Sequence, residues 1–163
     1  MIREMTGDAL RTHADIVAHQ TNVMGVMGGG IAKQIKERWP NVFNEYKNIC
    51  EQFVDPTVLL GGCKLVETND NAPRYVANLF GQIGFGRGKR ETNYEGLYEA
   101  LENLRSQTLE IIRKEWREPM TIAVPKNLGC GLAGGDWNIV KAMLYSLFEN
   151  ENDIELWIVE WIG

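Results

Sequence analysis

The stretch IVAHQTNVMGVMGGGIAKQI, residues 16–35, decides the fold. It opens with a compact apolar run, Ile16 to Ala18, which is typical of a buried central strand, and it closes with apolar residues at helical spacing. Gly25 and three consecutive glycines, 28–30, lie between the two at the mouth of the predicted helix. We call residues 22–30 the first glycine loop. A strand, a loop and a helix in this order favour a parallel βαβ unit.

The rest of the chain continues the alternation of strands and helices. Pro40 ends the helix predicted over 31–39 and suits the first turn of another helix. The patterns predict strands at 2–5, 58–66, 75–80, 121–124 and 154–161, and further helices at 40–53, 94–116 and around 140–147. We therefore expect an α/β protein with a mixed, mostly parallel six-stranded sheet in a three-layer α/β/α sandwich. The 163 residues fit one domain, 1–163.

Composition and charge argue against several function classes. No apolar run approaches the ~18 residues of a membrane helix, and no secretory signal is readable, so we expect a cytoplasmic protein with no membrane partner. Cys50, Cys63 and Cys130 are too far apart for a paired metal site, and neither His13 nor His19 completes one, so we assign no metal and no cofactor. The net charge of −5 argues against a nucleic-acid partner. We also expect a monomer.

One short stretch departs from this acidic character. The segment GQIGFGRGKRETN, residues 81–93, has no hydrophobic periodicity and carries Arg87, Lys89 and Arg90. We call it the basic loop. Two interpretations stay open for its charges, a solvated loop tip or a contact to an anionic substrate.

A second glycine-rich segment repeats the arrangement of the first. Residues 126–135, the second glycine loop, follow a predicted strand and precede the last helix. A helix start offers unpaired N–H groups and roughly half a positive charge, and glycine lets the backbone approach a ligand closely. The two loops therefore predict a pyrophosphate site built from main-chain amides, although close helix-to-sheet packing is an alternative for the first. No Walker pattern or dinucleotide fingerprint occurs, which argues against ATPases and NAD-dependent dehydrogenases.

Three stretches together resemble the macro domain family: TGDAL (6–10), DIVAHQTNVMGVMGGGIAKQI (15–35) and VPKNLGCGLAGGDW (124–137). The resemblance is strongest to its ADP-ribose 1″-phosphate phosphatase branch, in which a histidine precedes the Asn and three glycines precede Ile-Ala. It implies binding of ADP-ribose and hydrolysis of ADP-ribose 1″-phosphate to ADP-ribose and phosphate. The alternatives are a de-ADP-ribosylating or O-acyl-ADP-ribose hydrolase, or a non-catalytic ADP-ribose reader that docks on ADP-ribosylated proteins.

The same resemblance implies roles for individual residues. Asp8 would accept a hydrogen bond from the adenine amino group, or it is a turn or cap residue. Asn22 would face the distal ribose, or its side chain forms an Asx turn. His19 would move a proton during catalysis, or it is a histidine satisfied by backbone groups. His19 and Asn22 are thus the catalytic candidates, and the implied ligand-binding residues are Asp8, Ala9, Gly28, Gly29, Gly30, Ile31, Gln82, Asn127, Leu128, Gly129, Cys130, Gly131, Leu132 and Trp161.

Other positions separate this chain from a second branch that it resembles, the terminal ADP-ribose protein glycohydrolases. That branch uses a lysine nucleophile and an aspartate, and the matching positions here hold Gln82 and Ala133, which cannot perform that chemistry. Asp136 is interpreted as the N-cap of the last helix, with orientation of a water as the alternative. For the surface on which adenine lies, the aromatic candidates are Trp161, Phe80 and Phe85, with core packing favoured for Phe80.

Overall fold

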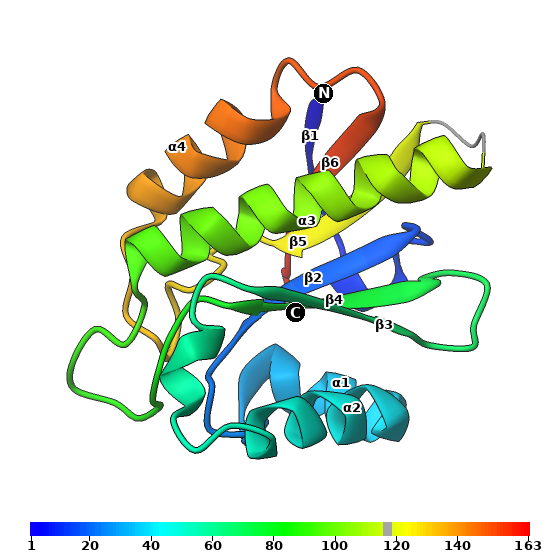
Figure 1. The fold of residues 1–163 in the computed structure, drawn as a ribbon. Helices are drawn as coiled ribbons and strands as arrows, with labels where there is room; N and C mark the ends of the chain where they lie inside the picture. Colours follow the sequence, from blue (N-terminus) through cyan, green and yellow to red (C-terminus); the bar gives the residue numbers. More distant parts are fainter. Residues whose placement is uncertain (116–118) are drawn as a thin grey trace.

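A computed structural model of the chain describes residues 1–115 and 119–163. Six strands form one sheet in the order β1-β6-β5-β2-β4-β3, in which only β3 runs antiparallel to its neighbour. Helices α3 and α4 cover one face of the sheet, and α1 and α2 cover the other (Figure 1). The expected three-layer α/β/α sandwich with a mixed, mostly parallel sheet is therefore confirmed.

The elements lie close to their predicted positions. The strands are β1 (Ile2–Thr6), β2 (Ile16–Thr21), β3 (Cys63–Glu67), β4 (Tyr75–Phe80), β5 (Met120–Pro125) and β6 (Ile154–Glu160). The helices are α1 (Gly30–Arg38), α2 (Pro40–Glu51), α3 (Tyr94–Glu115) and α4 (Trp137–Phe148), with short 3₁₀ turns at Ala9–Arg11 and Pro56–Leu59. The predicted end of the long helix at Trp116 lies outside the described residues.

The strand predicted at 58–66 is wrong in its first half. Residues Pro56–Leu59 form a 3₁₀ turn, and the strand begins only at Cys63. The side chain of Asp55 caps the turn by accepting hydrogen bonds from Thr57, and the proline that follows Asp55 occupies its first position. Local capping chemistry thus overrides the apolar character of Val58 to Leu60.

The sheet opens between its two central strands. The pairing of β2 with β5 covers only Ile16 with Ile122 and Val17 with Ala123. Beyond that point β2 continues along β4 as far as Thr21, and β5 continues along β6 as far as Pro125. The carboxyl ends of the two strands therefore separate, and the crevice that results lies where the chain connections diverge to opposite sides of the sheet.

Apolar side chains fill both layers of the sandwich. One cluster joins α3 and α4 to the sheet, and a second joins α1 and α2 to the other face.

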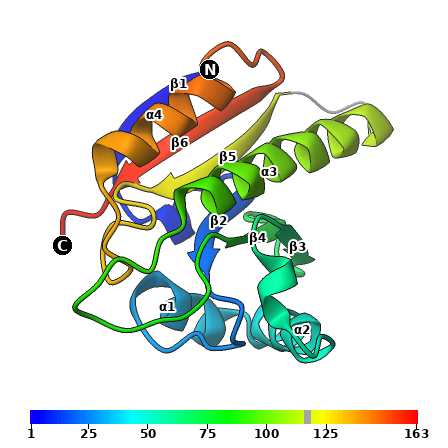
Figure 2. The same cartoon turned by 60° about the vertical axis from the view of Figure 1, so that its left-hand side comes forward.

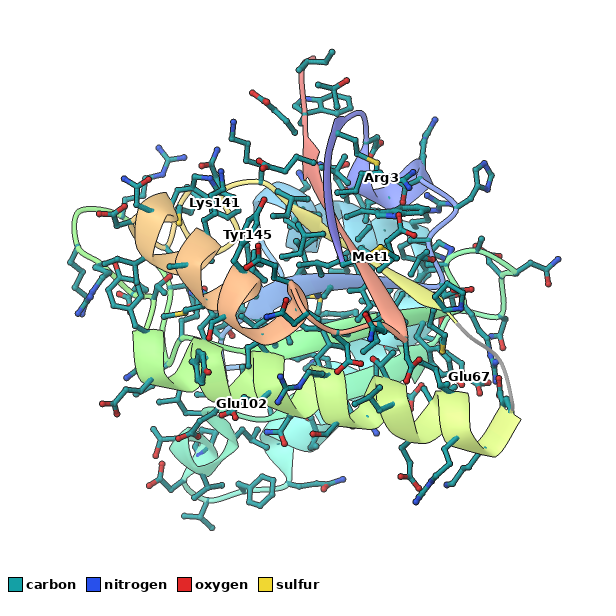
Figure 3. All side chains as sticks on the ribbon, turned by 90° about the horizontal axis from the view of Figure 1, so that it is seen from above. Met1, Arg3, Glu67, Glu102, Lys141 and Tyr145 are labelled. Carbon is teal, nitrogen blue, oxygen red and sulfur yellow. The ribbon has the colours of Figure 1, made fainter. Side chains whose placement is uncertain are left out.

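At the outer edge of the sheet, Glu4 of β1 accepts a hydrogen bond from the Tyr145 hydroxyl at 2.9 Å and pairs with Lys141 at 3.5 Å. Figure 3 shows Lys141 and Tyr145 along α4. No described helix combines the length and the apolar character that crossing a membrane requires.

Candidate functional site

Three loops gather at the carboxyl end of the parallel strands. The first glycine loop follows β2, the basic loop follows β4, and the second glycine loop follows β5. Figure 2 shows the basic loop, in green, running between the gold-coloured second glycine loop and α1. Since β2 and β5 part at this end of the sheet, the two glycine loops lie on either side of the crevice.

The first glycine loop delivers an open helix start. Gly29 is the N-cap of α1, and no side-chain hydrogen bond from the described residues caps this helix. Gly30 has φ +58, a left-handed conformation that favours glycine, and a Cβ built there meets nothing within 4 Å. The first amides of α1 and the positive end of its dipole are therefore available to an anion.

Asn22 organises the loop from within. Its Oδ1 accepts hydrogen bonds from the Met24 amide at 3.0 Å and from the Tyr46 hydroxyl at 2.6 Å, and its Nδ2 donates to the Val26 carbonyl at 2.9 Å. The Tyr46 hydroxyl lies also 2.8 Å from the Asn22 carbonyl oxygen. This is the Asx-turn arrangement, so the Asn22 amide supports the loop rather than extending toward a ribose, and its expected catalytic role has no support here.

The second glycine loop folds against itself and approaches the first. The Gly135 amide donates to the Gly129 carbonyl at 2.9 Å, and Gly129 has φ +70. A Cβ built on Gly29 would lie only 3.1 Å from Cδ1 of Leu132, so the two loops are in contact. The convergence expected from the two glycine-rich segments is confirmed, with the exposed Leu132 at the point of approach.

Among the expected ligand-binding residues of this loop, side-chain placement differs. Leu128 is buried in the core, whereas Asn127 is exposed with φ +69, and Gly131 and Leu132 are exposed as well. The Leu128 amide donates to the Pro125 carbonyl at 3.1 Å and its carbonyl accepts from the Cys130 thiol at 3.2 Å, so the main chain of Leu128 is engaged within the loop. Cys130 is half-buried, and burial raises the pKa of its thiol to about 11, so it stays protonated at neutral pH and is a poor nucleophile.

Three polar side chains connect the strands to the second glycine loop. The Gln20 Nε2 donates to Gln82 Oε1 at 2.8 Å and to Thr92 Oγ1 at 2.9 Å. Thr92 in turn donates to the Gly129 carbonyl at 2.6 Å, and Gln82 donates to the Gly84 carbonyl at 2.7 Å. Gln82, expected to bind ligand, is therefore committed to the basic loop and to Gln20.

His19 does not reach the crevice. It has no exposed surface, and it lies on the sheet face that α1 and α2 cover, where its Nε2 donates to Asn78 Oδ1 at 2.7 Å. Asn78 in turn donates to the Lys64 carbonyl, which fixes the orientation of its amide. Burial lowers the pKa of His19 to about 4. The expectation that His19 transfers a proton during catalysis finds no support, because a buried neutral imidazole has no access to water.

The adenine candidates lie at the neighbouring edge of the crevice. Asp8 caps the 3₁₀ turn that follows β1, because its Oδ1 accepts from the Leu10 amide at 2.9 Å. Ala9 is buried, whereas Trp161 is 68% exposed. Trp161 follows Glu160, the last residue of β6, which pairs with Thr6 of β1 and accepts a hydrogen bond from the Gly7 amide at 2.9 Å, so Trp161 leaves the sheet next to the turn that contains Asp8. Adenine contacts by Asp8 and Trp161 stay predictions.

The remaining acidic and aromatic candidates have structural roles. Asp136 caps α4 by accepting from the Asn138 amide at 2.9 Å, as the sequence predicts. Phe80 is buried and stacks on Tyr46 with ring centroids 5.9 Å apart, so its interpretation as a core residue is confirmed, whereas Phe85 is exposed. Among the described residues no group of three or more His, Cys, Asp and Glu side chains gathers as a metal site would require.

Sequence reasoning missed Tyr46, Gln20 and Thr92. In the sequence Tyr46 looks like one more apolar position of the α2 stripe, but its hydroxyl contacts Asn22, which lies 24 positions earlier in the chain. The apolar run Ile16 to Ala18 indicates a strand that ends before Gln20, so the sequence gives Gln20 no defined direction. The available signal was the spacing of polar residues after Ala18, since a strand extended to Thr21 directs Gln20 to the face opposite His19.

Comparison with known proteins agrees with this geometry. The model of the family described as Macro domain matches residues 18–144. The chain is 30% identical to a DNA ADP-ribosyl glycohydrolase of Mycobacterium tuberculosis over 95% of its own length, but it spans only 41% of that protein. It is 27% identical to an ADP-ribose 1″-phosphate phosphatase of Meyerozyma guilliermondii, over 80% of this chain and 83% of the relative.

The fold comparison leads to the same family. The macrodomain of Thermus aquaticus DarG superimposes with a TM-score of 0.80 at 26% identity and covers 98% of this chain and 97% of that one. The family model alone spans more than half of the 163 residues. The chain belongs to the macro domain family.

Proposed function

We propose that this chain binds ADP-ribose and hydrolyses the bond at the 1″ position of its distal ribose, with ADP-ribose 1″-phosphate as the first candidate substrate. The observation that carries the proposal is the contact of the two glycine loops at the uncapped start of α1. A diphosphate between these loops meets amides from both sides, so a chain of net charge −5 needs no dedicated lysine to hold it.

The arrangement also supplies a way to lower the reaction barrier. Backbone amides that are already fixed in position stabilise charge that develops on a phosphate oxygen, and they need no reorganisation during the reaction. The side chains of Asn22 and Tyr46 fix the first loop, and Thr92 fixes the second. With His19 buried and Cys130 protonated, the proposed reaction depends on direct attack by water on the polarised substrate.

A second candidate comes from the relatives. The glycohydrolases that match 95% of this chain are named for ADP-ribosylated DNA, so removal of ADP-ribose from DNA is the alternative activity. Gln82 occupies the position that the terminal glycohydrolase branch fills with lysine, and an amide cannot act as an amine nucleophile. The DNA activity would therefore also depend on water.

One assay separates these activities. Purified protein is incubated in parallel with ADP-ribose 1″-phosphate, O-acetyl-ADP-ribose, an ADP-ribosylated oligonucleotide and an ADP-ribosylated protein, and initial rates are compared. Release of inorganic phosphate at the highest rate supports the first candidate. Tight ADP-ribose binding by calorimetry with no turnover of any of the four would show a non-catalytic reader and refute the hydrolase proposal.

A variant pair tests whether the loop contact is the binding site. Gly29→Val fills the space beside Leu132, and the φ of −153 at Gly29 tolerates a side chain. We expect ADP-ribose affinity to fall about tenfold or more because a steric block removes several amide contacts. Adding Leu132→Ala removes the side chain that the new valine crowds. We therefore expect the double variant to regain any stability lost in Gly29→Val, whereas its ADP-ribose binding stays weak. Wild-type affinity in Gly29→Val would place the ligand elsewhere.

A further inference from the structure

An open groove of about 570 Å³ lies beside the second glycine loop. Its residues come from two segments, the tip of the basic loop and the middle of the second glycine loop. They are Arg87, Gly88, Lys89, Arg90, Gly131, Leu132 and Gly134. Leu132 also approaches Gly29 of the first glycine loop. The groove is therefore contiguous with the place where the two glycine loops meet.

Main-chain contacts hold the basic loop in this position. The amides of Glu91 and Thr92 both donate to the Ala133 carbonyl, at 2.8 and 3.2 Å. A Cβ built on Gly134 would lie 3.3 Å from the Cα of Arg90, so the two backbones are closely packed. The placement of the cations next to the second glycine loop is thus built into the fold.

The three cations leave donors available to a ligand. The Arg90 guanidinium stacks over the Tyr94 ring at 4.4 Å, which orients its plane while its N–H groups stay at the edge. Lys89 Nζ lies 3.5 Å from Glu91 Oε1, and the Lys89 side chain is 75% exposed. Arg87 forms no ion pair within the part of the chain that the structure describes. Among the described residues, the groove lining holds three cations and no carboxylate, and Glu91 pairs with one of the three, so the groove is locally positive on an acidic protein.

We propose that this groove binds phosphate carried by the group attached to the distal ribose, and so selects substrates with phosphate on that side of the scissile bond. The proposal rests on the proposed function, because the diphosphate between the glycine loops directs the rest of the substrate toward Leu132. Guanidinium groups bind phosphate through paired hydrogen bonds, and lysine adds a mobile point charge. The phosphate belongs either to ADP-ribose 1″-phosphate or to the backbone of an ADP-ribosylated nucleic acid.

The test compares two double variants with the wild type. Arg87→Ala/Lys89→Ala empties the groove of two cations, and Arg90 is kept to preserve its stacking on Tyr94. Arg113→Ala/Lys114→Ala removes the same two residue types from the far end of α3 as the matched control. Calorimetry at two salt concentrations measures the affinity of each protein for ADP-ribose, ADP-ribose 1″-phosphate and an ADP-ribosylated oligonucleotide.

We expect the groove variant to bind ADP-ribose within about twofold of wild type and at least one phosphate-bearing ligand about tenfold more weakly, with a smaller salt dependence. The control should match the wild type throughout. Weakening for ADP-ribose 1″-phosphate identifies the monoester as the source, and weakening for the oligonucleotide alone identifies the nucleic-acid backbone. Equal affinities in wild type and groove variant overturn this inference alone, whereas a wild type that binds no ADP-ribose overturns the proposed function as well.

Discussion

Replacing Tyr46 with Phe tests whether the first glycine loop must be held in place to bind its ligand. The Tyr46 hydroxyl lies 2.6 Å from Oδ1 and 2.8 Å from the carbonyl oxygen of Asn22, and the side chain is fully buried. Burial raises the pKa of this hydroxyl, so it remains a donor at every working pH. Phe keeps the ring that stacks on Phe80 and removes only the donor.

The magnitude follows from what remains after the change. Asn22 Oδ1 still accepts the hydrogen bond from the Met24 amide at 3.0 Å, so this buried acceptor loses one donor but keeps another. We expect the free energy of unfolding to fall by about 1–2 kcal/mol. We also expect the Kd for ADP-ribose to rise about fivefold, which corresponds to about 1 kcal/mol of added loop ordering.

The assays are urea denaturation for stability and isothermal calorimetry for ADP-ribose binding. Phe80→Leu is the matched control, because it removes packing from the same cluster and leaves the Tyr46 hydroxyl in place. We expect it to lower the free energy of unfolding by about 1–2 kcal/mol. We expect this control to bind with wild-type affinity. If Tyr46→Phe loses stability but binds ADP-ribose as tightly as the wild type, loop positioning by Tyr46 is refuted.

Three further predictions test neighbouring features. The pKa of His19 is lowered to about 4 in the folded protein, so folding favours its neutral form. The free energy of unfolding should therefore fall as the pH drops from 6.5 toward 4, by up to about 3 kcal/mol. In His19→Gln, the urea midpoint should change less with pH than in the wild type when it is measured between about pH 7 and 5. Asp136→Ala should lower the unfolding free energy by about 1 kcal/mol in the same denaturation assay, whereas Asp136→Asn keeps the cap; equal losses in both would contradict the capping role. Cys130→Ser should leave the initial hydrolysis rate within about twofold, because the thiol is protonated at neutral pH, and a rate loss above tenfold would instead identify it as a nucleophile.

The sequence was sufficient for the layers of the fold because hydrophobic periodicity is a local property. Each strand and helix buries a stripe whose spacing is visible within its own segment, and the glycines 28–30 mark the start of α1 without reference to the rest of the chain. Errors arose where a local signal had two structural meanings. The apolar residues Val58 to Leu60 fit a strand, but the capped turn that starts at Pro56 determines their conformation.

The side chains around the crevice were harder to predict, because their roles depend on distant partners. His19 belongs to a strand that is three residues longer than the apolar run Ile16 to Ala18, and the alternation of side chains along the strand turns His19 toward α1 and α2. The Asn22 side-chain oxygen accepts a hydrogen bond from the hydroxyl of Tyr46, a residue that belongs to the distant helix α2. The site is therefore predictable as a pair of loops, whereas its supporting residues become visible only after the chain has folded.

The reliance of the crevice on main-chain amides has an evolutionary consequence. Amide groups are present whatever side chain a position carries, so most substitutions around the first and second glycine loops would leave the proposed diphosphate contacts intact as long as the backbone path is preserved. Arg87, Lys89 and Arg90 have no such protection, because a single codon change alters their charge. Under the two proposals made above, affinity for the common nucleotide part would persist through extensive divergence, while the choice of leaving group would change within a few mutations.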